Sequence, residues 1–298
     1  MAPALLTGAE VSGKPQAAFP TLTHVAAVQA DAEVTLAAEA SGSNAPASAE
    51  AQSRGYCREG MAEVAGEYCE NLAQYCVRYD GDPARDRCLE FRATSRCLGP
   101  KKPLRVCVDR YEYPNRVGEK PIVAVDWEQA GELCAAEGKR LCTADEWTLA
   151  CEGPEGRPYP YGATRDSEAC NIDKPYIMPD NEAFANPATR DEEIARVDQR
   201  EPSGSRARCA SSFGVQDMTG NVDEWVLNEG GSDNVKPFNS GLKGGWWGPV
   251  RNRCRPMTLD HNKWHKGYQI GFRCCSDVRQ SGPSAGQSGA GEPALVGS

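Results

Sequence analysis

Residues 125–153 read VDWEQAGELCAAEGKRLCTADEWTLACEG, and the spacing of their apolar positions predicts two helices joined by a sharp turn. Asp126 is a good N-cap for the first helix, and Gly138 suits the position just beyond its C-terminus. The inward face of this helix repeats at i, i+3 and i+7 and carries Trp127, Ala130 and Cys134. Cys134 is therefore expected in the core.

The second helix begins with a capping box, because Thr143 is followed three residues later by Glu146. Its inward face would carry Trp147, Ala150 and Cys151. Each helix of the pair therefore directs one cysteine toward the core.

The chain beyond these helices has a different pattern. Residues 151–213 are rich in Pro, Asn, Asp and Gly and lack helix or strand periodicity, which is typical of a functional loop or of one held by metal ions or disulfides. Short apolar runs broken by Gly follow at 213–226, 242–256 and 268–275. They favour strands and tight turns.

Composition divides the chain into four parts. Residues 1–54 and 278–298 are dominated by small and polar residues, and such segments bury too little apolar surface to fold, so both are predicted to be disordered tails. Residues 55–106 form a Cys-rich part whose shape depends on cross-links, and residues 107–277 form the main domain.

All 14 cysteines fall within the predicted folded part, and no C-x-x-C pair occurs among them. This spacing favours structural disulfides over zinc clusters and therefore an oxidising compartment. The N-terminus shows no basic segment followed by an apolar core. We therefore expect an extracytoplasmic protein, whether secreted, periplasmic or lipid-anchored as a lipoprotein, whose export signal is missing from this sequence.

Charge and hydropathy exclude two classes of partner. The formal net charge of −9 would repel the phosphates of nucleic acid. No run of about 18 apolar residues is present, so no transmembrane segment is predicted.

Four motifs occur together in one order: GKRLCTADEW at 138–147, DMTGNVDEW at 217–225, GG at 244–245 and GFRC at 271–274. In this order and spacing the chain resembles the formylglycine-generating enzyme (sulfatase-modifying factor) family. The resemblance implies an irregular, disulfide-rich α+β fold of the formylglycine-generating enzyme type, related to C-type lectins and stabilised by calcium.

The resemblance also implies two disulfides, Cys134–Cys274 and Cys151–Cys254. For the remaining cysteines we predict the pairs Cys142–Cys275 and Cys170–Cys209, each of which closes a loop and so restricts the unfolded chain.

DMTGNVDEW resembles the calcium loop of that family. Carried over, its ligands are Asp217, Gly220, Val222 and Glu224, and a second calcium site would begin at Asn171 and Ile172. Ca²⁺ prefers hard oxygen ligands of this kind, and glycine permits the tight turn. The alternative is a capped turn in which the two carboxylates bind only backbone N–H groups.

This chain departs most from the family pattern at the catalytic segment. In the enzymes, GG is followed by two cysteines that bind Cu(I), activate O₂ and convert the Cys of a C-x-P-x-R motif to formylglycine. Residues 246–253 contain no Cys, and Cys254 matches a structural cysteine. Cu(I) requires thiolate or thioether ligands. No catalytic residue is therefore predicted, and copper is not expected.

Two histidines near the C-terminus offer another metal site. His261 and His265 at i, i+4 would share a helical face and could bind a metal together with Asp260. The simpler alternative is that both histidines are exposed loop residues.

A binding cleft is the remaining hypothesis for this region, because large aromatic side chains next to Arg are typical of recognition sites. Its candidate residues are Trp246, Trp247, Arg251, Arg253, Arg255 and Trp264. The alternative is that the tryptophans are core residues and the arginines support them through internal ion pairs.

Three functions remain open. The first is an exported, calcium-stabilised domain that binds a peptide or a glycan without generating formylglycine. A second is an oxidoreductase of the same superfamily with altered metal ligands. The third is a structural protein of the cell envelope.

Overall fold

The computed structural model describes residues 56–81 and 87–279. The predicted tails lie outside these ranges, except for residues 278 and 279. None of the helices in the described ranges is long and apolar enough to cross a membrane.

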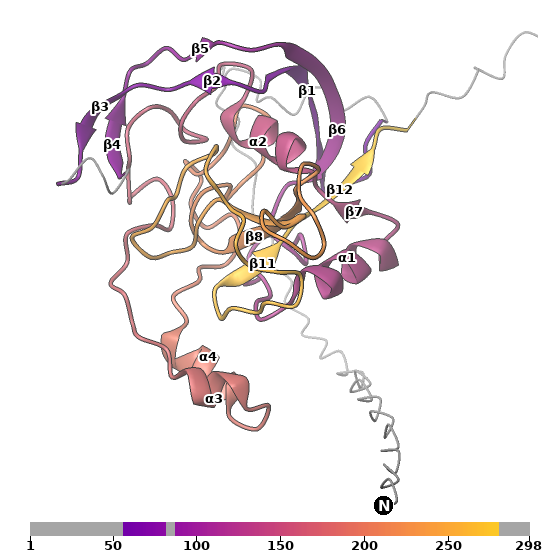
Figure 1. Ribbon diagram of the computed structural model, residues 1–298, viewed down its shortest axis with the longest axis vertical. Coiled ribbons are helices and arrows are strands. Elements are labelled where there is room, and N and C mark those ends of the chain that lie inside the picture. Colours follow the sequence, from indigo (N-terminus) through magenta and orange to yellow (C-terminus); the bar gives the residue numbers. More distant parts are fainter. Residues whose placement is uncertain (1–55, 82–86, 280–298) are drawn as a thin grey trace, which may run out of the picture. The chain divides into compact units, whose positions relative to one another are not determined.

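The first four-stranded sheet joins the two ends of the described chain (Figure 1). Its order is β1 (Met61–Cys69), β6 (Lys101–Asp109), β12 (Cys274–Asp277) and β7 (Arg140–Leu141). β1 and β6 pair antiparallel along their full length, from Met61 opposite Asp109 to Cys69 opposite Lys101. β6 crosses the boundary predicted at 106/107, so residues from both predicted parts share one sheet.

The second four-stranded sheet has the order β10 (Met257–Thr258), β9 (Ser240–Lys243), β8 (Asp223–Leu227) and β11 (Ile270–Phe272). β8 and β9 are antiparallel, whereas β8 and β11 are parallel. Trp225, Leu242 and Phe272 form its buried apolar face. Each such fully buried side chain contributes on the order of 2 kcal/mol to folding.

Helices α1 (Trp127–Ala136) and α2 (Ala144–Glu152) confirm the predicted helix pair. Capping boxes at Asp126 and Thr143 begin them, and Gly138 follows α1 with a φ of +66°. α2 packs against β1, β6 and β8 and buries Trp147 completely. Trp127 is partly buried, and its indole N–H donates to the carbonyl oxygen of Val226 at 3.0 Å.

Two further helices interrupt the segment for which the sequence predicts no periodic structure. These are α3 (Asn181–Ala185) and α4 (Arg190–Val197), which lie beside each other in Figure 1. That prediction was wrong for these residues because both helices are short, and α3 buries no residue. Asp180 caps α3 by accepting from two backbone N–H groups.

Seven disulfides join all fourteen cysteines, and none is free. The four pairs named from the sequence are present: Cys134–Cys274, Cys151–Cys254, Cys142–Cys275 and Cys170–Cys209. The other three are Cys57–Cys107, Cys69–Cys97 and Cys76–Cys88.

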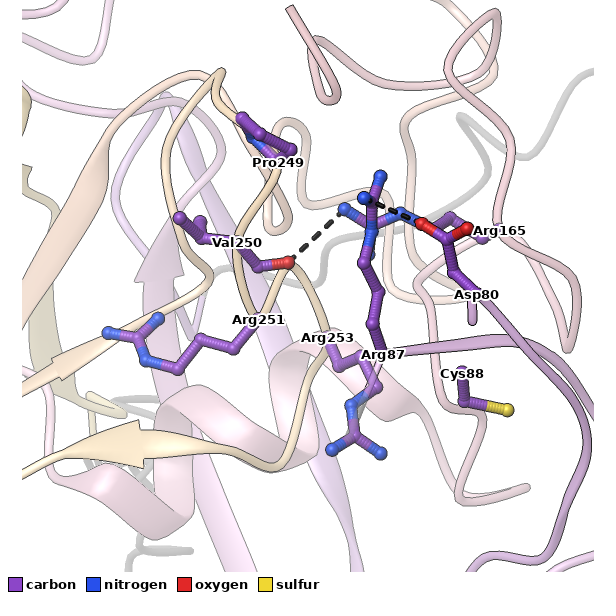
Figure 2. Close-up of a pocket in the computed structure, with 8 residues that line it drawn as sticks. All are labelled: Asp80, Arg87, Cys88, Arg165, Pro249, Val250, Arg251 and Arg253. Atoms are coloured by element: carbon purple, nitrogen blue, oxygen red, sulfur yellow. Dashed lines mark hydrogen bonds and ion pairs between the residues drawn. The ribbon is translucent and has the colours of Figure 1, made fainter. Parts of the chain in front are cut away.

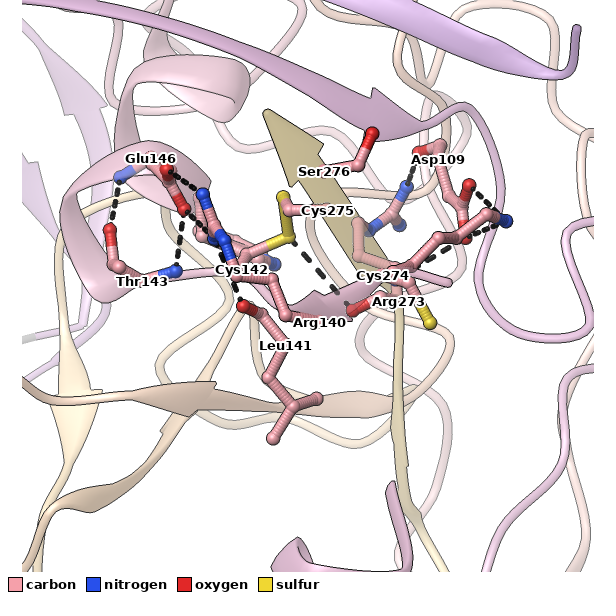
Figure 3. Close-up of a disulfide and its surroundings, with 12 residues drawn as sticks. Asp109, Arg140, Leu141, Cys142, Thr143, Glu146, Arg273, Cys274, Cys275 and Ser276 are labelled. Carbon is pink, nitrogen blue, oxygen red and sulfur yellow. Dashed lines mark hydrogen bonds and ion pairs between the residues drawn. A yellow bond between two sulfur atoms is a disulfide. The ribbon is translucent and has the colours of Figure 1, made fainter. Parts of the chain in front are cut away.

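The adjacent Cys274 and Cys275 point to opposite sides of β12 and therefore take different partners. Figure 3 shows Cys275 bridged to Cys142 between β12 and the start of α2. Cys274 instead reaches Cys134 in α1. Two disulfides therefore connect β12 to helix α1 and to the residue before the N-cap of α2.

Candidate functional site

Gly244 and Gly245 turn the chain after β9 toward the first residue of β8. Both have left-handed conformations, with φ of +88° and +72°. A Cβ on Gly244 would lie 2.9 Å from the carbonyl oxygen of Met218, closer than a side chain tolerates. The backbone N–H of Gly245 donates to Oδ1 of Asp223 at 3.3 Å. The segment after the two glycines is thereby held against β8.

That segment forms one wall of a cavity of about 300 Å³, which we call the Trp246 pocket. The pocket gathers side chains from β8, β9, β10 and the loops between them. Its lining residues are Asp223, Leu242, Trp246, Val250, Arg251, Thr258, His261 and Gln269.

The buried Asp223 and the partly buried Arg251 form an ion pair in the wall. Nη2 of Arg251 donates to both carboxylate oxygens at 2.9 and 3.0 Å, and its Nε donates to Oγ1 of Thr258 at 2.6 Å. Burial raises the pKa of Asp223, and the Arg251 charge opposes that rise. The pair therefore fixes the orientation of both side chains.

Two polar atoms on residues lining the pocket have no partner. Nη1 of Arg251, a donor, and Oε1 of Gln269, an acceptor, are both buried and unpaired within the described part of the chain. An unpaired buried polar group costs about 1–3 kcal/mol. A ligand group that both accepts and donates hydrogen bonds would satisfy the two atoms.

Three carboxylates are buried around one guanidinium beneath β8. Nε and Nη2 of Arg273 donate to the two oxygens of Glu224 at 2.7 Å each. Glu112 accepts from Nδ2 of Asn221 at 2.6 Å, and Asp217 accepts from the N–H of Gly204 at 2.7 Å. Burial raises the pKa values of Glu112 and Asp217, and neighbouring carboxylates add to the rise. Arg273 donates directly to Glu224, and its charge partly opposes the rise in the pKa values of Glu112 and Asp217.

Residues 103–278, more than half of the chain, match the Sulfatase-modifying factor enzyme 1-like domain. The chain belongs to this family. With its short strands and helices, the structure has the predicted α+β fold of the formylglycine-generating enzyme type.

Two curated relatives illustrate the position of the chain in the sulfatase-modifying factor family. The Mus musculus protein named inactive C-alpha-formylglycine-generating enzyme 2 is 27% identical over 173 residues, which cover 54% of this chain and 50% of the relative. The Bos taurus formylglycine-generating enzyme is 24% identical over 175 residues, covering 53% and 39%. The chain thus spans half or less of the length of these relatives.

Among solved structures, PvdO from Pseudomonas aeruginosa is similar over 72% of this chain and 94% of its own, with 17% identity and a TM-score of 0.44.

Trp246, Val250 and Arg251 of the Trp246 pocket belong to residues 246–253, the segment in which the family resemblance implies two copper-binding cysteines. No thiol is available there, because Cys254 is bonded to Cys151. Of the six predicted cleft residues, Trp246 and Arg251 line this pocket.

The other four predicted cleft residues lie elsewhere. Trp247 is a core residue, 1% exposed, and Trp264 projects outward, 60% exposed. Arg255 makes an internal ion pair with Glu152 at 2.6 Å. The Arg253 guanidinium lies 5.3 Å from the ring centre of Phe91 and lines a different pocket.

The two histidines lie close together, but in a loop. The rings of His261 and His265 stack with centres 3.9 Å apart, and no helix contains them, so the predicted helical face was wrong. Asp260 is exposed, 3.9 Å from Lys236. Within the described residues, no cluster of three or more His, Cys, Asp or Glu side chains is arranged to hold a metal ion.

The residues predicted to bind calcium include, or lie next to, the buried carboxylates of Asp217 and Glu224. Glu224 has both oxygens bonded to Arg273. Oδ1 of Asn171 is buried without a partner among the described residues. The backbone N–H of Asn221 donates to the carbonyl oxygen of Asn171 at 3.0 Å, so the two predicted calcium loops are in contact.

The sequence reasoning missed Glu112, Asp223, Thr258 and Gln269. Asp223 could have been found, since it lies inside the DMTGNVDEW motif and begins strand β8. Glu112 carries no local signal, because its partner Asn221 is 109 residues away.

Proposed function

We propose that this domain does not generate formylglycine and instead binds a peptide or a glycan in the Trp246 pocket. The observation that carries the proposal is the state of the cysteines. All fourteen are paired in disulfides, and the segment after Gly244 and Gly245 contributes Trp246 and Arg251 to the pocket instead of thiols. Cu(I) binds thiolates, and this wall has none to offer.

The pocket has the composition of a recognition site. Trp246 offers an aromatic surface, while the Asp223–Arg251 pair holds polar groups in fixed positions. Ligand sites commonly combine an apolar wall with a few oriented polar groups. The unpaired donor and acceptor on Arg251 and Gln269 suit a peptide amide or a sugar hydroxyl, since each of these groups donates and accepts.

The comparisons add a supporting argument. The relative with 27% identity is itself named inactive, whereas the one named formylglycine-generating enzyme is 24% identical. Loss of the activity on this scaffold therefore has a parallel in a similar protein.

Gln269→Leu tests the binding site. The protein would be screened against immobilised peptides and glycans, and the affinity of each hit measured. We expect Gln269→Leu to weaken binding at least about 10-fold while leaving the melting temperature unchanged or higher, because it removes an unpaired buried acceptor.

Trp246→Ala should also lose binding, whereas Arg208→Gln, at an exposed ion pair with Asp166, should not. Hits that bind both pocket variants as tightly as the unmodified protein would contradict the proposal.

We further propose that calcium stabilises the domain through Asp217, Gly220, Val222 and Glu224, with Asn171 and Ile172 at a second position. Support comes from the buried carboxylates of Glu112, Asp217 and Glu224, of which Glu224 is bonded to Arg273, and from the side-chain carbonyl oxygen of Asn171, which has no partner among the described residues. Both are hard oxygen donors of the kind that Ca²⁺ prefers. Calcium would add positive charge beside Asp217.

Chelation tests the calcium proposal. Removal of calcium should lower the melting temperature, and added CaCl₂ should restore it, because a ligand that binds only the folded state stabilises it. Asp217→Asn should abolish the response. An identical melting temperature with and without chelator at neutral pH would contradict a role for these residues.

Seven disulfides are typical of an oxidising, extracytoplasmic location. We propose that the protein is secreted, periplasmic or lipid-anchored. Alkylation of the cell-derived protein without reduction should modify no cysteine; extensive modification would assign the protein to a reducing compartment.

A further inference from the structure

The two unpaired polar atoms of the Trp246 pocket require different groups from a ligand. Nη1 of Arg251 can only donate a hydrogen bond, and Oε1 of Gln269 can only accept one. Both atoms are buried, and neither has a partner among the described residues. Because they belong to separate segments of the chain, a ligand with its acceptor and its donor on separate atoms satisfies both.

The Arg251 guanidinium is directed toward the Trp246 pocket. Figure 2 shows it pointing away from the guanidinium of Arg87, which precedes β4 (Cys88–Phe91). Its Nε and Nη2 bond Thr258 and Asp223, both of which line the Trp246 pocket. Nη1 of the same planar group is therefore held in place to bond a ligand there.

The carboxylate and the guanidinium that line the pocket neutralise each other. Nη2 of Arg251 lies 2.9 Å from Oδ2 of Asp223, and none of the other described lining residues is Asp, Glu, Lys or Arg. A charged ligand group would lose water here without finding an opposite charge that is free to pair with it. The pocket therefore suits an uncharged ligand.

The sheet beside the pocket offers little backbone to an extended peptide. β8 and β9 are interior strands, and the edge strand β10 contains only two residues. At the other edge, the backbone N–H of Tyr113 already donates to the carbonyl oxygen of Phe272 in β11 at 2.8 Å. A peptide that extends a sheet takes its main-chain hydrogen bonds from a free edge. A sugar needs no such edge, so the surroundings of the pocket favour a sugar over a peptide.

Trp246 presents a fixed aromatic wall to a ligand. Its ring packs against the rings of Trp247 and Tyr268, with centres 5.4 and 6.0 Å apart, which holds it in one orientation. Leu242 and Val250 complete the apolar part of the lining. The polarised C–H groups of a sugar ring pack on an aromatic face, where the π-electrons are partly negative. The wall therefore suits a sugar ring that carries a small apolar substituent.

We propose that the Trp246 pocket binds an N-acetylhexosamine unit of a glycan, an inference that rests on the proposed binding function of this pocket. The acetamido carbonyl oxygen accepts from Nη1 of Arg251, the acetamido N–H donates to Oε1 of Gln269, and the methyl group lies against the apolar wall. This group is uncharged and carries its acceptor and donor on separate atoms. The cavity of about 300 Å³ is at the lower limit of typical small-molecule sites, so it takes one sugar unit.

Matched pairs of methyl glycosides separate the acetamido group from the sugar ring. Those of N-acetylglucosamine and N-acetylgalactosamine would be titrated into the full-length protein beside those of glucose and galactose, which carry a hydroxyl instead, and followed by ligand-observed NMR. The better acetylated sugar should bind at least about 10-fold more tightly than its hydroxyl counterpart, because it adds a hydrogen bond and a buried methyl group. Equal affinities within both pairs would overturn the inference.

Gln269→Leu tests the acceptor of the acetamido N–H. The preference for the acetylated sugar over its hydroxyl counterpart should fall several-fold in this variant. Gln74→Leu is the matched control, since the Nε2 of Gln74 donates to the carbonyl oxygen of Gly156 outside the pocket, and it should keep the full preference. An unchanged preference in Gln269→Leu would contradict the assignment.

A measurement on the unmodified protein covers a variant that does not fold. Saturation transfer from the protein should be strongest at the acetyl methyl protons, which would lie against Leu242 and Val250, and weakest transfer at that methyl would overturn the inference. Binding of screened peptides without binding of the four sugars at about 10 mM would overturn this inference and leave the proposed function. Absence of binding by both peptides and sugars would overturn both.

Discussion

The N-terminal hairpins and the family domain are stabilised in different ways. In the hairpins β2 (Leu72–Ala73) with β5 (Arg96–Cys97), and β3 (Cys76–Tyr79) with β4, disulfides close loops of 28 and 12 residues. Several large apolar side chains of this region are exposed: Tyr75, Val77, Tyr79 and Leu98. The hairpins thus combine local cross-links with a small buried cluster, in which Cys88 and Phe91 of β4 pack against Tyr159.

The family domain, residues 103–278, combines buried apolar clusters with long-range cross-links. Trp147, Trp225 and Phe272 are completely buried. Its disulfides Cys134–Cys274, Cys142–Cys275 and Cys151–Cys254 span 140, 133 and 103 residues. Disulfides therefore close short loops in the hairpins, whereas in the family domain they connect elements that are far apart in the sequence.

The largest predicted effect compares one disulfide from each region. Replacing Cys134 and Cys274 by Ala should cost roughly 5 kcal/mol of unfolding free energy, whereas replacing Cys76 and Cys88 should cost roughly 3 kcal/mol, because the entropy of loop closure grows with loop length. Denaturant titration of the two double variants measures the difference. A larger loss for the Cys76–Cys88 variant would reverse the comparison.

The second prediction compares buried and exposed ion pairs. Arg273→Met should destabilise the protein by about 3–5 kcal/mol, because it leaves Glu224 buried without its partner. Arg78→Met breaks an exposed pair with Glu90 in the hairpins and should cost less than about 1 kcal/mol. Similar losses for the two variants would contradict the expectation that removing a buried partner costs more than removing an exposed one.

The helix pair could be predicted from sequence because its signals are local. Capping boxes and the 3.6-residue period lie within a few residues of Asp126 and Thr143. The absence of cysteine from residues 246–253 could likewise be read directly from the sequence.

The rest depends on contacts between distant residues. Gln269 lines the Trp246 pocket only because β11 pairs with β8, and no local pattern predicts that contact. The helix expected at His261 and His265 failed because spacing alone was its support, without a cap or an apolar face. Helix α3 was not predicted although Asp180 is a good N-cap, because a helix with no buried face leaves no apolar period in the sequence.

The smallest predicted effect is the pH dependence that the buried Lys243 gives to the unfolding free energy. Burial lowers the pKa of Lys243 to about 7. Unfolded lysine keeps its proton up to about pH 10.4, so between pH 7 and 10 the unfolded state binds more protons than the folded state. The unfolding free energy should therefore rise with pH in this window, by up to about 1.4 kcal/mol per pH unit.

Lys243→Met should remove this rise, which denaturant titrations at pH 7, 8 and 9 would measure. Lys243 donates to Oγ1 of Thr148 at 2.7 Å, so the variant also loses that contact at every pH. An unchanged slope in the variant would assign the pH dependence to other groups.

The central claim is that the domain retains the scaffold of its family without formylglycine generation. The most direct measurement incubates the protein, loaded with copper, with a C-x-P-x-R peptide, O₂ and a thiol reductant, and follows the peptide by mass spectrometry beside an active enzyme of the family. We predict that the cysteine remains unconverted. Conversion to formylglycine at a rate near that of the active enzyme would contradict the account.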